Sequence, residues 1–274
     1  MRPMLVTGFP AGTFQTNCWL VAPAESAEAL VVDPGQDALA GIDELCRRHR
    51  LKPVAALCTH GHLDHIWTVA PLAGAHDIPA FVHPADRHLL TDPLAGFGPE
   101  ARGAFGGLRL QEPDDVRELA DGQVVELAGL RLLVDHTPGH TPGHVTFRSA
   151  ADGDQPGHLL AGDLVFAGSI GRTDLPGGST TQMLASLASR FLPLPDDLMV
   201  LPGHGPTTTV GRERATNPFL HGLDPVRRGG PGDRQGGPPV DRGGPGDRQG
   251  GPPVDRGGPG DRQGGPPVDL GSRT

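Results

Sequence analysis

Short apolar runs recur between residues 4 and 201 and predict β-strands. Each run holds three to five residues, which is too short for a helix, and many are followed by glycine, proline, aspartate or histidine. The predicted strands cover residues 4–6, 18–21, 30–32, 54–58, 79–82, 124–127, 130–134, 144–147, 158–161 and 199–201. Strands are therefore expected in both halves of the chain.

Apolar residues at helical spacing predict helices between these strands. Residues 36–50 and 180–191 repeat apolar side chains every three or four positions, with polar side chains on the opposite face. Shorter helices are expected at residues 66–73, 84–90 and 210–215. This alternation indicates the mixed α/β class, and two sheets covered by helices would account for it.

Residues 91–113 follow neither pattern. The segment is rich in glycine and proline and carries Phe97 and Phe105. A segment this long without regular structure in a compact domain is usually functional or disordered. We interpret it as a candidate lid, or as a wall of a substrate pocket.

The character of the chain changes after residue 223. The unit Arg-Gly-Gly-Pro-Gly-Asp-Arg-Gln-Gly-Gly-Pro-Pro-Val-Asp occurs three times, at 228–241, 242–255 and 256–269. A unit with valine as its one large apolar residue cannot form the apolar face that stacked repeats need, and its glycines do not follow the collagen period. We therefore expect a folded domain at residues 1–223 and a disordered tail at 224–274. Weak binding of a protein partner by the tail is a secondary hypothesis.

Composition excludes several classes of partner. The net charge is −9 and no basic patch stands out, so nucleic acid is not expected to bind. No apolar run approaches the roughly 20 residues that span a membrane, and the N-terminus lacks the pattern of a signal peptide. The three cysteines, Cys18, Cys46 and Cys58, are read as free structural thiols. A cytoplasmic protein is expected.

Chemistry is concentrated in one short segment, Thr59-His60-Gly61-His62-Leu63-Asp64-His65, which directly follows a predicted strand. Imidazole nitrogen and carboxylate oxygen are ligands for zinc and similar divalent cations. Crowding four such groups together without partners would be costly, and a bound cation removes that cost. The alternative is a solvated polar loop that happens to be rich in histidine.

Three more candidate ligands follow predicted strands. They are His140 in Thr137-Pro138-Gly139-His140, Asp163 in Ala161-Gly162-Asp163, and His204 in Pro202-Gly203-His204-Gly205. Thr-Pro-Gly-His occurs twice in succession, so spacing alone does not distinguish His140 from His144. His83 and His136 lie beside strand ends and are candidates for an outer layer around the site.

These four motifs, in this order, resemble the metallo-β-lactamase-fold hydrolases over residues 4–221. The resemblance implies an αββα four-layer sandwich with two divalent metal ions. Zinc is the expected metal, with iron or manganese as alternatives. By the same resemblance, His60, His62 and His140 hold the first ion, Asp64, His65 and His204 hold the second, and Asp163 bridges the two. His144 is then a buried or supporting residue.

The resemblance implies metal-assisted hydrolysis. Two cations would share a water molecule and lower its pKa, and the hydroxide would attack a carbonyl carbon. Asp64 would orient this hydroxide or carry its proton. No serine nucleophile is needed, and the chain contains no Gly-x-Ser-x-Gly elbow.

Within this fold, the chain looks most like the short bacterial glyoxalase II-like enzymes, which hydrolyse thioesters of the S-lactoyl-thiol type. The similarity rests on residues 168–174 and 201–206 and on the later Glu213-Arg214 and Asn217-Pro218-Phe219. Arg172 lies where that group has a basic residue, which makes it a candidate for substrate binding. The repeats replace the helical domain of full-length glyoxalase II, and the chain has no tyrosine, so the carrier thiol stays open.

Three other functions are considered. A persulfide dioxygenase of the same fold would use one iron, held by His60, His140 and Asp163. Other hydrolases of the fold act on lactams, lactones or phosphodiesters. The third is a non-enzymatic scaffold stabilised by metal, which the filled ligand set disfavours. The variant His60→Ala separates an enzyme, which loses activity, from a scaffold, which loses stability.

Overall fold

The computed structural model describes residues 4–226, apart from residue 26, residues 99–102, residue 104 and residues 152–155. The three repeats lie outside the described residues. No helix in the described part of the chain is long and apolar enough to cross a membrane.

Six strands form the first sheet, in the order β1-β2-β3-β4-β5-β6. Strands β1 to β3 pair antiparallel, and β3 to β6 pair parallel. Their bounds are β1 Leu5–Ala11, β2 Thr16–Ala22, β3 Glu28–Val32, β4 Lys52–Leu57, β5 Ala80–Val82 and β6 Val116–Glu118.

The second sheet also has six strands, in the order β14-β13-β10-β9-β8-β7. All its pairs are antiparallel except β10 with β13. The bounds are β7 Val124–Leu127, β8 Leu130–His136, β9 Val145–Arg148, β10 His158–Gly162, β13 Met199–Pro202 and β14 Thr208–Thr209. A separate hairpin of β11 Val165–Phe166 and β12 Ser169–Ile170 follows β10.

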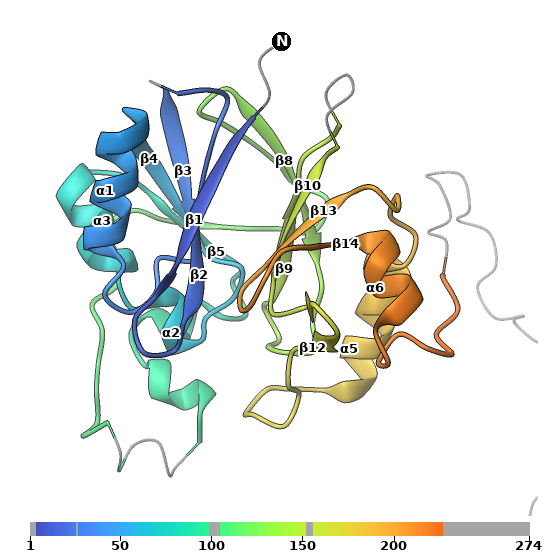
Figure 1. The fold of residues 1–274 in the computed structure, drawn as a ribbon. Helices are drawn as coiled ribbons and strands as arrows, with labels where there is room; N and C mark the ends of the chain where they lie inside the picture. The colour runs from blue at the N-terminus through green and yellow to red at the C-terminus, as the bar shows by residue number, and fades with distance from the viewer. Residues whose placement is uncertain (1–3, 26, 99–102, 104, 152–155, 227–274) are drawn as a thin grey trace, which may run out of the picture. The chain divides into compact units, whose positions relative to one another are not determined.

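Helices cover the outer face of each sheet (Figure 1). Helices α1 and α3 lie on the first sheet, and α5 and α6 lie on the second. The helices are α1 Leu39–His49, α2 Leu63–Ile66, α3 Val69–His76, η1 Arg87–Leu90, η2 Pro93–Gly96, α5 Thr180–Ser186, its wider-turned continuation η3 Leu187–Phe191, and α6 Val210–Thr216. The predicted αββα sandwich is confirmed.

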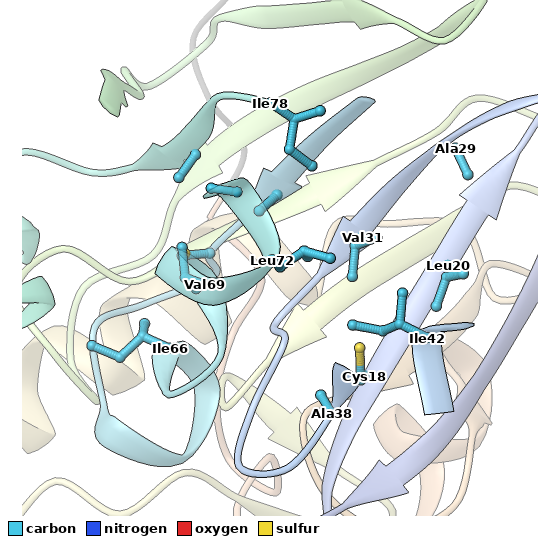
Figure 2. Close-up of a cluster of buried hydrophobic side chains, with 14 of the residues drawn as sticks. Cys18, Leu20, Ala29, Val31, Ala38, Ile42, Ile66, Val69, Leu72 and Ile78 are labelled. Atoms are coloured by element: carbon cyan, nitrogen blue, oxygen red, sulfur yellow. The ribbon is translucent and has the colours of Figure 1, made fainter. Parts of the chain in front are cut away.

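Three layers of buried side chains hold this sandwich together. Each strand contributes to two of them, because successive strand residues point to opposite faces of the sheet. Leu20 packs under the helices of the first sheet, whereas the next residue, Val21, packs between the sheets. In the second sheet, Leu160 faces the inner layer and Leu159 faces the outer helices. Figure 2 shows the first outer layer, where Ile42 and its neighbours meet the strands.

Several sequence predictions of local structure are wrong. The helix expected at 66–73 is two helices, because Thr68 leaves the helical conformation and donates its backbone N–H to Pro34 O instead. The strand expected at 4–6 runs to Ala11 as part of a long hairpin. Strands β6, β11, β12 and β14 were not predicted, because each has only two or three residues and gains its place from pairing rather than from local pattern.

The fold places the ends of five strands at one edge of the sandwich. Residues of interest follow the carboxyl ends of β3, β4, β8, β10 and β13. The two sheets meet there, because Thr16 at the start of β2 forms a bridge with His204 after β13. Asn17 adds a backbone hydrogen bond to Gly203 O at 2.7 Å.

Candidate metal centre

Three histidines from two loops form the first ligand group. Potential ligand atoms of His60, His62 and His140 lie within 4.8 Å of one another, and all three residues are buried. His62 Nδ1 is 2.8 Å from His140 Nε2. His140 Nδ1 donates to the carbonyl oxygen of Arg172 at 2.7 Å, so its Nε2 carries a lone pair that is directed into the group.

Asp64, His65 and His204 form the second group. His204 Nε2 lies 3.1 Å from Asp64 Oδ2, and His65 Nε2 lies 3.4 Å from the same oxygen. These residues come from helix α2 and from the loop after β13. The group therefore depends on contact between the two sheets.

Asp163 lies between the two groups. Its Oδ1 is 3.4 Å from His65 Nε2, and its Oδ2 is 3.4 Å from His140 Nε2 and 3.7 Å from His204 Nε2. One carboxylate thus faces ligand atoms of both groups. The structure brings together all seven residues that the sequence analysis singled out as ligands.

The donor set fits divalent cations. Three buried ligand atoms have no hydrogen-bond partner in the described residues: His60 Nε2, His65 Nε2 and Asp163 Oδ1. Buried polar atoms are almost always satisfied, so three unsatisfied atoms in one cluster need an explanation. A bound metal ion would supply the missing partner for imidazole nitrogen and carboxylate oxygen alike.

Electrostatics keep most of these groups in the form that binds metal. Burial, reinforced by neighbouring histidines, lowers the pKa of His60 and lowers that of His62 to about 3. Burial alone would raise the pKa of Asp64, but His65 and His204 outweigh it and lower the value to about 2. The same balance lowers the pKa of Asp163. Neutral imidazoles and ionised carboxylates are the ligand forms that metal binding requires.

His65 and His204 shift in the other direction. Burial would lower the pKa of His65, but Asp64, Asp163 and Asp33 together raise it. Burial would also lower the pKa of His204, which the hydrogen bond with Asp64 and the charge of Asp163 raise. A cation at this group would therefore compete with protons.

Asp33 supports ligands of both groups, and the sequence analysis did not single it out. Its carboxylate accepts from His65 Nδ1 at 3.0 Å and from the amide and hydroxyl of Thr59 at 2.7 Å each. Because the Thr59 hydroxyl donates to Asp33, it accepts from His60 Nδ1 at 3.1 Å. Both histidines thus keep Nε2 for a cation. An aspartate directly after an apolar strand was the available signal.

Thr16 and Asn17 were also missed. The Thr16 hydroxyl donates to Asp64 Oδ2 at 2.9 Å. The Asn17 amide donates to Pro202 O and Gly205 O at 3.0 and 2.8 Å, which holds the loop that carries His204. Both residues are buried polar side chains of β2. Nothing in the local sequence distinguishes them from ordinary strand residues.

His144 is fully buried and outside both ligand groups. Its Nε2 accepts from the backbone N–H of Asp163 at 3.0 Å, so its Nδ1 donates to the Thr137 hydroxyl at 2.8 Å. Both ring nitrogens are therefore engaged. This geometry explains why the second Thr-Pro-Gly-His motif supplies a supporting residue.

The other predicted residues lie around the centre in different ways. The Arg172 side chain is exposed and forms a two-point ion pair with Asp174 at 2.7 and 2.8 Å. His83 and His136 stack on each other with ring centroids 4.2 Å apart and belong to neither ligand group. His136 Nε2 instead donates to Pro142 O at 2.8 Å, in the loop after His140.

Two phenylalanines flank the centre. The Phe97 ring lies 5.3 Å from the His62 ring, and the Phe166 ring lies 5.9 Å from the His204 ring. Both phenylalanine residues are partly exposed. The start of the segment 91–113 therefore lies against a ligand, whereas residues 99–102 and 104 are outside the described part of the chain.

Known proteins are similar to this chain in sequence and in fold. Residues 11–204 match the model of the metallo-beta-lactamase superfamily. The hydroxyacylglutathione hydrolase GloC of Haemophilus influenzae is 34% identical over 217 residues, which cover 77% of this chain and 96% of that protein. The crystal structure of the B3 metallo-beta-lactamase BLEG-1 has a TM-score of 0.70 at 38% identity, over 80% of this chain and 100% of that chain. TTHA1623 in a di-iron-bound form has a TM-score of 0.64 at 39% identity, over 78% and 100%. This chain belongs to the metallo-beta-lactamase superfamily.

Proposed function

We propose that this metallo-hydrolase binds two divalent metal ions and hydrolyses a thioester of the S-lactoyl-thiol type. The observation that carries the proposal is the convergence of seven ligand residues, three of which direct buried atoms without hydrogen-bond partners into the cluster. The first ion is assigned to His60, His62 and His140 and the second to Asp64, His65 and His204. Asp163 faces both groups. The sequence similarity to the hydrolase GloC supports the choice of substrate.

When bound, two cations would supply Lewis acidity, which lowers the pKa of water and stabilises negative charge on a carbonyl oxygen. The residues of the chain provide the rest. Asp64, whose pKa is about 2, is ionised at neutral pH and can only accept a proton. The Thr16 hydroxyl holds one of its oxygens in place. Asp64 is thus suited to orient a water molecule by accepting a hydrogen bond from it.

The surroundings of the centre suit a substrate with an apolar and a charged part. Phe97 and Phe166 offer apolar surface beside the first and second ligand groups. The exposed Arg172 offers positive charge close by, since its own carbonyl oxygen contacts His140. An exposed ion pair is weak, so a carboxylate on the thiol carrier could replace Asp174 as the partner of Arg172.

The rival functions differ in the ligands they need. A dioxygenase with one iron at His60, His140 and Asp163 would leave Asp64 and His204 without a role, although these two lie 3.1 Å apart in the second group. A lactam substrate is the second candidate, because BLEG-1, at 38% identity, is a metallo-beta-lactamase. Metal identity is also open between zinc and iron, because TTHA1623 is described in a di-iron-bound form.

Release of free thiol from S-lactoylglutathione tests the proposal. Purified protein should release thiol, and His60→Ala, checked for folding by circular dichroism, should not. Elemental analysis of the same samples should find two metal equivalents in the wild type. Parallel assays should measure hydrolysis of a cephalosporin and oxygen uptake with glutathione persulfide. Turnover in either of these, with no thiol release from any acyl-thiol tested, would overturn the thioester proposal.

A further inference from the structure

Asp86 is a fully buried carboxylate that joins the two loops of the tri-histidine group. Its Oδ2 accepts from the backbone N–H of Gly61 at 2.9 Å and from the Thr141 hydroxyl at 2.6 Å. Its Oδ1 accepts from the backbone N–H of Gly143 at 2.7 Å. Asp86 itself precedes η1, which belongs to neither loop.

The position of these donors along the chain is what matters. Gly61 is the residue between His60 and His62, and Thr141 directly follows His140. The Asp86 side chain therefore links Gly61, which lies between two ligands of the group, to Thr141, which follows the third ligand. The packing is close as well, because a Cβ atom on Gly143 would lie 2.6 Å from Asp86 Oδ1.

The charge of Asp86 gives a second, independent observation. All three donors are neutral, and none of the ion pairs among the described residues includes Asp86. A buried carboxylate with no cation beside it is costly. The tri-histidine group, in contrast, consists of neutral ligands and would gain from negative charge nearby when it holds a cation. The negative charge of Asp86 would stabilise a cation in the tri-histidine group, and that cation would offset the cost of burying the carboxylate.

We propose that Asp86 is a positioning residue for the tri-histidine group, which sets the spacing of its two loops and supplies negative charge for the ion bound there. The proposal rests on the metal centre of the proposed function and is independent of the substrate. Loss of such supporting hydrogen bonds typically costs about 10- to 100-fold in metal affinity. Asp86→Asn should impose this cost on one of the two ions, because the shape is kept while one acceptor and the charge are lost.

Titration of metal-stripped protein with Zn²⁺ and Co²⁺ tests the proposal. Wild type should bind two equivalents, and Asp86→Asn should bind one at wild-type affinity and the other about 10- to 100-fold more weakly. The Co²⁺ absorption spectrum should lose the component of the weakened site. Glu213→Gln is the matched control, because Glu213 is also a buried carboxylate with three neutral donors but lies on α6. It should keep both equivalents even if its melting temperature falls.

The possible results distinguish failure of the Asp86 proposal from failure of the proposed function. Two equivalents of wild-type affinity in Asp86→Asn would overturn the role of Asp86 and leave the proposed function standing. A wild type that binds no metal would instead overturn the proposed function and this proposal with it. If Asp86→Asn does not fold, Thr141→Val removes one hydrogen bond of the same carboxylate with little change in shape. Unchanged affinity in a folded Thr141→Val protein would then count against the proposal.

Discussion

The side chain of His140 is hydrogen-bonded to the backbone of Arg172: the ring Nδ1 of His140 donates to the carbonyl oxygen of Arg172 at 2.7 Å. The contact gives Arg172 two separable parts. Its carbonyl oxygen orients a ligand of the metal centre, whereas its exposed guanidinium forms an ion pair with the exposed Asp174 and with no other acidic residue in the described part of the chain. Replacing the Arg172 side chain therefore tests substrate binding without disturbing His140.

Arg172→Ala should retain both metal equivalents and wild-type stability but raise KM for a thioester with an anionic carrier. The reason is that the variant keeps the carbonyl oxygen that accepts from His140 and loses only the charge. Steady-state kinetics and elemental analysis measure the two effects. Arg117→Ala is the matched control, because Arg117 is another exposed arginine paired with an aspartate two positions away. Equal KM values for the two variants would contradict a substrate-binding role.

Asp33→Asn should weaken the second metal site. An asparagine at this position has one acceptor oxygen in place of two and cannot satisfy both the Thr59 donors and His65 Nδ1. The tautomer and orientation of His65 would no longer be fixed, which typically costs about 10- to 100-fold in affinity. Zn²⁺ titration with a competing chelator measures the loss. Wild-type affinity at both sites would show that Asp33 only stabilises the fold.

The ligands could be predicted from sequence, whereas most residues that support them could not. His60, His62, Asp64 and His65 form a local pattern, which is readable without any structure. Asp86 and Gly143, by contrast, are 57 positions apart, and their contact exists only because two loops converge.

The fold, too, could be predicted from the sequence only where the local pattern of residues reflects it. Short apolar runs predict strands because they reflect which side chains are buried, and most strands of both sheets were anticipated in this way, whereas the layered sandwich was implied by the family resemblance. Two-residue strands such as β14 carry no such pattern. Thr16 donates to Asp64 across 48 positions, so its function is a property of the packed sheets rather than of the segment around it.

Metal affinity should rise with pH. Burial would lower the pKa values of His65 and His204, but the neighbouring carboxylates raise both above the usual value, so a cation must displace protons that these groups hold more tightly than a free imidazole does. Binding should release protons, and the affinity should fall as pH is lowered. Calorimetric titration of stripped protein in buffers with different ionisation enthalpies counts the protons released. An affinity that is independent of pH between 6 and 8 would contradict the assigned second group.

Phe97→Ala and Phe166→Ala should change the preference for the substrate. Each ring offers apolar surface beside a different ligand, so each loss should raise KM more for long acyl chains than for lactoyl. An acyl series on one carrier thiol measures this effect. Phe219→Ala removes a phenylalanine that is 50% exposed and in contact with no ligand ring in the described residues, so it should leave the series unchanged. A uniform change across the series would argue that the rings only support the ligands.

Gly203→Ala should disrupt the centre, although Gly203 is not itself a ligand. A Cβ atom at this position would lie 2.2 Å from Asp163 Oδ1 and 2.7 Å from His65 Cε1. Both neighbours are buried, so neither can move aside, and overpacking of this kind costs about 1–3 kcal/mol. The variant should melt at a lower temperature and bind less metal.

Gly74→Ala is the opposite case and serves as the control for Gly203→Ala. Gly74 lies in α3, is exposed, and has open space where a Cβ atom would be placed. The substitution should raise stability by about 0.5–1 kcal/mol, because alanine loses less conformational freedom in a helix than glycine does. Thermal unfolding and metal analysis of both variants separate the effects. If Gly203→Ala kept two metal equivalents and its melting temperature, Asp163 could not be held as close to Gly203 as the structure places it.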